Sequence, residues 1–232
     1  EVRDICTCYR VLGIGHLLLS ADPTDYAENL GKSGLCWLYY LQNNSPKNMV
    51  SSWGAAFFDA VSCLDTDTAQ GIAKQSPASH NASYEYEEEF LYMAFIMRYY
   101  AGETPKNLEP LLASWSALLN GIEDARFGFC EALIGNELDP LQEALLAAIG
   151  AVRDELNSVS DTGTVPADHY AALAHVSTEV VTWVQLCKAK GLAVEEDYAL
   201  APSPAVLSTL QSLPAADSWR ILDKTYNSLK EA

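Results

Sequence analysis

The clearest pair of potential metal ligands in this chain is His175 and Glu179, which are four positions apart. On a helix this spacing places two side chains on one face, so both could reach the same ion. His169 would point elsewhere on that helix, and a metal site needs three or four ligands. We therefore interpret the pair as solvated or partly packed side chains, and we predict neither a metal nor a cofactor.

Cysteine and glycine patterns give no stronger sign of catalysis. Cys6 and Cys8 are the only close pair among the six cysteines, and no second pair completes a zinc site. The letters GKSG at 31–34 are typical of a phosphate-binding loop, but here they lie inside a helical pattern. No Gly-x-Ser-x-Gly sequence is present, and only four histidines are available as bases. We predict no catalytic residues, although a site assembled by the fold would not show in the spacing.

Two acidic clusters are the most distinctive polar features. The first acidic cluster lies in what we expect to be the first turn of an aromatic helix, and it comprises Glu85, Glu87, Glu88 and Glu89. The second acidic cluster follows Gly191 in a predicted loop, and it comprises Glu195, Glu196 and Asp197. Stabilising a helix N-terminus through its dipole is a sufficient structural role for the first cluster. The functional alternative is a surface that meets a basic partner, and we name both clusters as candidate partner-binding residues.

Helical periodicity dominates the elements that must position these side chains. The segment from Leu141 to Leu156 shows it best, because its apolar residues recur at the three- and four-residue spacing of one helix face. Asp139 is placed to cap this helix, and Pro140 suits the first helical position. A second long helix is predicted from Ala167 to Lys190, where Gly191 follows the last turn.

The remaining pattern predicts shorter helices and little else. They are expected at about 26–42, 49–64, 65–74, 84–101, 110–119, 122–134, 203–213 and 218–229. Residues 192–200 alternate only loosely, and we expect an extended, capping loop there. The breaks are short, so no domain boundary is marked and residues 1–232 should form one domain. We predict an all-α fold of about 8–10 helices in antiparallel hairpins, either solenoid-like or an irregular bundle.

The composition favours protein binding over binding to nucleic acid or membranes. Fourteen Lys and Arg stand against 31 Asp and Glu, for a formal net charge of −17, and 49% of the residues are hydrophobic. A field of this sign repels phosphate backbones and anionic lipid headgroups, and it speeds encounter with a basic protein. No apolar run approaches the roughly 18 residues that span a bilayer. We predict no nucleic-acid partner and no membrane contact.

The cysteines and the chain start bear on the cellular compartment. Four cysteines lie in apolar helical patterns, which indicates reduced thiols in a reducing compartment. The chain begins at Glu1 without an initiator methionine, so an upstream segment was trimmed or cleaved. We expect a cytoplasmic protein, or a periplasmic one if a signal segment was removed before Glu1.

Two stretches resemble a helical family of bacterial polymorphic-toxin immunity proteins. The first is FGFCEALIGNE at 127–137, followed by the helix that carries EAL at 143–145 and Arg153. The second is GLAVEEDYALAP at 191–202, which follows a long helix. In that family a short helix, an acidic turn and a long helix with an Ala-Leu pair recur, and the chain ends similarly. The resemblance extends over about 53–207, and no catalytic residue carries over from it.

This resemblance implies a protein that neutralises a toxin delivered between bacteria, by type VI secretion or on contact, through tight one-to-one binding. We therefore expect an immunity protein whose acidic face covers the active site or substrate groove of a cognate toxin. The negative charge favours a basic toxin, such as a nuclease. Two alternatives remain open: a helical-repeat adaptor that binds peptides in a concave groove, and an enzyme whose site the fold assembles.

Overall fold

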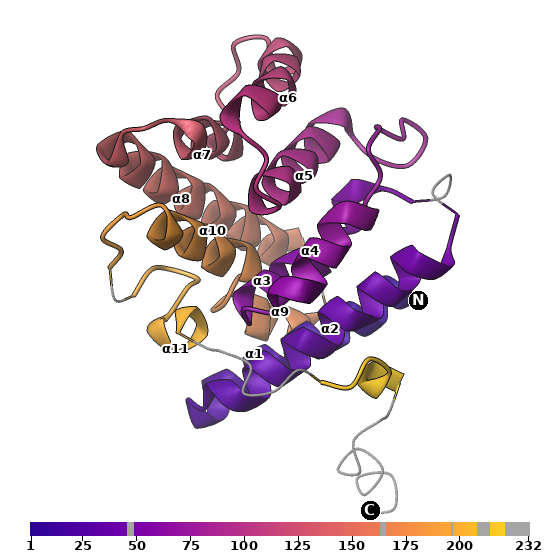
Figure 1. The fold of residues 1–232 in the computed structure, drawn as a ribbon. Helices are drawn as coiled ribbons and strands as arrows, with labels where there is room; N and C mark the ends of the chain where they lie inside the picture. Colours follow the sequence, from indigo (N-terminus) through magenta and orange to yellow (C-terminus); the bar gives the residue numbers. More distant parts are fainter. Residues whose placement is uncertain (46–48, 163–165, 196, 208–213, 221–232) are drawn as a thin grey trace, which may run out of the picture.

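The protein is an assembly of helices, shown in Figure 1 as a computed structural model that describes residues 1–45, 49–162, 166–195, 197–207 and 214–220. Within these ranges every regular element is a helix, and the one β-bridge joins Tyr198 to Ala201. The predicted all-α fold is confirmed. In chain order the elements are α1 (Val2–Ser20), α2 (Pro23–Asn43), η2 (Ser51–Trp53), α3 (Ala56–Ser62), α4 (Thr66–Gln75), α5 (Glu87–Tyr100), α6 (Pro105–Leu119), α7 (Ala125–Ile134), α8 (Leu138–Thr162), α9 (Ala167–Leu173), α10 (Thr178–Ala189), α11 (Ser203–Val206) and η3 (Ser218–Arg220).

The first two helices form a hairpin along one side of the molecule (Figure 1). Asp22 starts α2 by accepting a hydrogen bond from the Thr24 N–H at 2.8 Å, and Pro23 occupies the first helical position. The helices approach closely at Gly13, where a Cβ atom would lie 3.0 Å from the Tyr26 carbonyl oxygen. Helix α1 was not among the elements predicted from periodicity.

Helix α3 lies at the centre, and all of its residues are buried. It packs against α2, α4 and α10, while α5 adds a nearly continuous run of buried side chains. Aromatic contacts join these layers: the ring centroids of Phe57 and Tyr100 are 5.5 Å apart, and those of Phe129 and Trp183 are 5.2 Å apart. Such pairs stabilise the core by about 0.5–1.5 kcal/mol each beyond the burial of their area.

A buried polar network around Asp59 connects four helices. The Asp59 side chain is 0% exposed, and its two oxygens accept hydrogen bonds from the Arg10 guanidinium at 2.6 and 2.8 Å. The hydroxyl groups of Ser33 and Thr178 donate to the same carboxylate at 2.5 and 2.9 Å. Burial lowers the Arg10 pKa, but the charge and hydrogen bonds of Asp59, with smaller contributions from Cys6 and Tyr26, together outweigh burial and raise the pKa. The network thereby ties α1, α2 and α10 to α3.

The predicted helix from Ala167 to Lys190 is wrong as one element, because the structure divides it into α9 and α10. The break is made at Ser177, whose hydroxyl oxygen accepts from the Val180 N–H at 3.4 Å and caps α10. The Ser177 N–H in turn donates to the Leu200 carbonyl at 2.8 Å. The loop predicted at 192–200 therefore supplies an acceptor that replaces the helical one.

Several other boundaries differ from prediction. Helix α5 begins at Glu87 and not at Tyr84, α6 begins at Pro105, and α8 extends from Leu138 to Thr162. The segment predicted as one helix at 49–64 is instead a 3-10 turn followed by α3. Helix α11 ends at Val206, and the remainder of the two closing helices predicted at 203–213 and 218–229 lies mostly outside the described residues.

The packing also distinguishes between the two predicted architectures, a solenoid-like array and an irregular bundle. In a solenoid each repeat contacts only its neighbours in sequence. Here α10 packs on α3 and α1 packs on α9, so distant segments share one core and the fold is an irregular bundle. No helix in the described part of the chain is long and apolar enough to cross a membrane.

Candidate functional site

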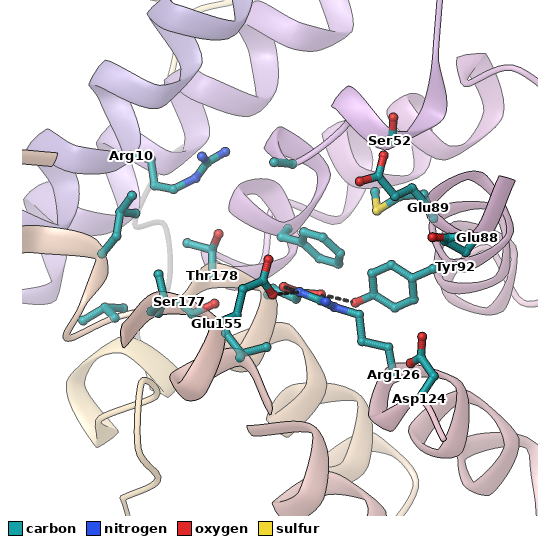
Figure 2. A pocket seen from close by; sticks show the side chains of 18 of the residues that line it. Arg10, Ser52, Glu88, Glu89, Tyr92, Asp124, Arg126, Glu155, Ser177 and Thr178 are labelled. Atoms are coloured by element: carbon teal, nitrogen blue, oxygen red, sulfur yellow. Dashed lines mark hydrogen bonds and ion pairs between the residues drawn. The ribbon is translucent and has the colours of Figure 1, made fainter. Parts of the chain in front are cut away.

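A cleft of about 440 Å³ has a lining that comes from α1, η2, α3 and α5 through α10 (Figure 2). Its floor is apolar and buried, and it includes Phe58, Met93, Trp115, Val152 and Val176. Its rim carries the exposed carboxylates of Glu88, Glu89 and Glu155. We call this feature the acidic cleft.

An ion-pair network organised by Arg126 forms one wall of the acidic cleft. Its Nε and Nη2 atoms donate to the two carboxylate oxygens of Glu179 at 2.9 and 3.2 Å, and Nη2 also donates to Glu155 at 3.2 Å. Burial lowers the Arg126 pKa, but the charge and hydrogen bonds of Glu179, together with Tyr92 and Glu155, outweigh burial and raise the pKa. Paired charge-assisted hydrogen bonds of this kind fix both position and orientation.

Tyr92 extends the network into the core. Its hydroxyl donates to Glu179 Oε1 at 2.6 Å and accepts from the Trp183 indole N–H at 3.0 Å. The guanidinium carbon of Arg126 lies 5.7 Å from the centre of the Tyr92 ring. Burial, reinforced by the charge of Glu179, raises the Tyr92 pKa well above 10.0, so the phenol stays protonated and acts as a donor.

Arg126 and Glu179 each lie in the capped first turn of a short helix, Arg126 in α7 and Glu179 in α10. The Asp124 carboxylate accepts from the Phe127 N–H at 2.9 Å, which starts α7 and places Arg126 at its second position. The Ser177 cap starts α10 in the same way and places Glu179 at its second position. Local capping signals thus aim the guanidinium and the carboxylate at each other across the cleft wall.

The acidic cleft has an excess of negative charge. Its lining carries the carboxylates of Glu88, Glu89, Asp124, Glu155 and Glu179 and the guanidinium groups of Arg10 and Arg126. Arg10 is neutralised by Asp59 and Arg126 by Glu179, so neither cation is available to an anionic ligand. Among the described residues Glu88 and Glu89 form no ion pair.

The first acidic cluster is only partly assembled at this site. Glu88 and Glu89 line the cleft, whereas Glu87 is exposed on the same turn but does not line it. Glu85 departs from the prediction, since it precedes α5 and is 9% exposed. Its carboxylate accepts from the backbone N–H groups of Ser52 at 2.9 Å and Asn81 at 3.2 Å, so it holds loops together. We therefore omit Glu85 from the proposed binding surface.

Glu195 and Asp197 of the second acidic cluster do not line the cleft. Glu195 and Asp197 are exposed, and the Asp197 carboxylate accepts from the Ser203 N–H at 2.7 Å at the start of α11. Glu196 lies outside the described residues. A partner-binding role for Glu195, Glu196 and Asp197 stays a prediction.

His175 and Glu179, considered above as potential metal ligands, do not lie on one helix. His175 precedes the Ser177 cap, so it does not share a helix with Glu179, which instead pairs with Arg126. In the described ranges no group of three or more His, Cys, Asp or Glu side chains could hold a metal ion. All six cysteines are free, and only Cys8 is exposed.

Sequence reasoning missed Arg126 and Tyr92 as site residues. One signal was present: an arginine two positions after a capping Asp lies at the positive end of the helix dipole, where a cation is unfavourable. An arginine in that position needs a carboxylate partner from elsewhere in the fold.

The fold and the site define an all-α bundle with a preformed acidic cleft. The chain belongs to the Immunity protein 49 family, whose family model matches residues 21–205 and so covers α2 to the start of α11. The resemblance to bacterial immunity proteins is confirmed, and this membership implies toxin neutralisation in general. Comparisons with curated proteins and with solved structures gave no match.

Proposed function

We propose that the protein neutralises one cognate toxin by binding it tightly and covering its active site or substrate groove. Family membership supports toxin neutralisation, and the acidic cleft is the observation that supports direct recognition. A concave, apolar floor surrounded by charge combines the burial and the electrostatic complementarity that tight protein interfaces use. The toxin is basic, with a nuclease as the favoured class, because the net charge of −17 attracts a positively charged partner.

We place this action in the cytoplasm of a bacterium that competes by type VI secretion or contact-dependent delivery. The six free cysteines support a reducing compartment. Neutralisation there needs no turnover by the immunity protein, since occupying the toxin is sufficient.

Co-expression with the toxin encoded beside its gene tests the proposal. Growth should be rescued, and the two proteins should co-elute as one complex in gel filtration. Weak binding to many unrelated peptides, without rescue, would indicate an adaptor instead. Loss of toxicity through chemical modification of the toxin, without a stable complex, would indicate an enzyme.

Charge reversal of Glu87, Glu88 and Glu89 to Lys provides a sharper test. If these side chains attract the toxin, the association rate should fall and its dependence on salt should flatten, because screening acts on the same electrostatic attraction. Stopped-flow measurements between about 50 and 500 mM salt cover the range over which the Debye length becomes short. An unchanged rate and salt response would assign these carboxylates to helix stabilisation alone.

A further inference from the structure

The acidic cleft combines a buried apolar floor with exposed carboxylates at its rim. Phe58, Met93 and Val176 are at most 5% exposed, whereas the side chain of Glu155 is 59% exposed. This gradient fits a ligand that is apolar along a stem and positively charged at one end. Lys and Arg side chains have this form, because their methylene stems pack on apolar surface while the cationic group stays near water.

We propose that the acidic cleft receives a lysine or arginine side chain of the toxin, with its stem on the apolar floor and its cationic group among Glu88, Glu89 and Glu155. The identity of the donor protein rests on the proposed function, but the chemistry of the cleft does not. A cleft of about 440 Å³ lies within the usual range for pockets that enclose a ligand, so it accommodates the side chain together with flanking backbone.

The resident arginines do not pair with Glu88 or Glu89 among the described residues. Arg10 is held by two short hydrogen bonds to Asp59, which lies outside the lining, and Arg126 is held by two to Glu179. Figure 2 shows Arg10 across the view from Glu88 and Glu89, and neither of these two carboxylates forms an ion pair among the described residues. A third cation entering the cleft would compensate the charges of Glu88 and Glu89, which no arginine of the lining pairs with.

Glu155 is placed to join the incoming group. It contacts Arg126 through one hydrogen bond of 3.2 Å, whereas Glu179 contacts Arg126 through two. Arg126 would keep Glu179 as its partner if Glu155 turned toward a ligand. Tyr92 and Trp183 would continue to hold Glu179, so binding would not disturb the wall behind it.

The test uses N-acetyl-arginine amide and N-acetyl-lysine amide as probes, with N-acetyl-citrulline amide as the uncharged isostere of the arginine probe. Amide chemical shifts of the ¹⁵N-labelled protein should move around the first turns of α5 and α10 and beside Glu155 as probe is added. The citrulline probe should leave them unchanged at the same concentration. The affinity for the arginine probe should fall by about fivefold in each of E88Q, E89Q and E155Q, the change that about 1 kcal/mol produces.

E87Q is the matched control, because it removes the same charge from the same exposed turn without touching the lining. It should change the affinity less than about twofold, the effect expected of a screened charge outside the cleft. Equal weakening by E87Q and E89Q, shifts spread evenly over the acidic surface, or equal binding of the citrulline probe would each overturn the proposal.

The two proposals fail separately. If the arginine probe binds as described but the toxin is neither bound nor neutralised, the proposed function is wrong and the cleft chemistry stands. If the toxin is bound and neutralised equally well by wild type and by E88Q/E89Q, the function stands and the toxin does not use the cleft.

Discussion

Replacing Asp59 by Ala should be among the most destabilising single changes in this protein. The variant removes four hydrogen bonds and leaves Arg10, whose side chain is 12% exposed, without its counter-ion inside the fold. Breaking a buried ion pair from one side costs about 3–5 kcal/mol, because the remaining charge has lost its hydration and gained no partner. With a urea slope of about 3 kcal/mol per M, the unfolding midpoint should fall by more than about 1 M.

Urea unfolding followed by circular dichroism and by tryptophan fluorescence measures this loss. E28A is a suitable control, since Glu28 pairs with Lys32 at 2.7 Å on the surface of α2 and is 50% exposed. Exposed pairs at this spacing contribute about 0.3–0.5 kcal/mol. The double variant R10M/D59L should recover part of the lost stability, because it removes both charges together. If D59A and E28A lower the free energy of unfolding by amounts within about 1 kcal/mol of each other, the reasoning about the buried network is refuted.

Three further predictions concern the cap, the cleft wall and high pH. S177A should lower the free energy of unfolding by about 1 kcal/mol through loss of the α10 cap, whereas S177D should retain most of it, as thermal unfolding would show. R126A should lower the free energy of unfolding by about 3 kcal/mol, because Glu179, which is 16% exposed, loses its cation in the cleft wall. The control R153A, on the exposed side of α8, should lower it by under about 0.5 kcal/mol in the same urea experiment. Burial raises the folded pKa of Tyr26 and Tyr92 above the usual 10.0, so the unfolded chain releases these protons first. Stability should therefore hold below about pH 9 and fall as the pH rises beyond 10, and a flat urea midpoint from pH 9 to 11 would contradict this.

Periodicity predicted the helices that bury one face, and it failed where burial or capping depends on distant segments. The helix around Leu141–Leu156 was predictable because its apolar stripe is a local pattern. Helix α1 was missed because it exposes Leu12 and Leu19 while burying Ile14 and Leu17, so no single apolar face stands out. The break at Ser177 depends on the carbonyl of Leu200, a partner that no window of one helix contains.

The candidate site likewise contains residues that the local sequence reveals and contacts that only tertiary packing makes. Glu88 and Glu89 were found because neighbouring charges in a chain form a visible cluster. The Arg126–Glu179 and Tyr92–Glu179 contacts join residues 53 and 87 positions apart, and only tertiary packing brings them together. Glu85 was assigned to the surface with its neighbours because sequence proximity does not reveal that its carboxylate turns inward to loop N–H groups.

The wide sequence span of the cleft lining, from Arg10 to Glu179, has a consequence for synthesis in the cell. A ribosome that has released only the first half of the chain has delivered Glu88 and Glu89 but neither Glu155 nor Glu179. The nascent chain then carries these carboxylates without Val152 and Val176, so the apolar floor is incomplete. Protection should therefore lag translation until nearly the whole polypeptide has emerged, so a cell survives on the stock of immunity protein completed before the toxin arrives.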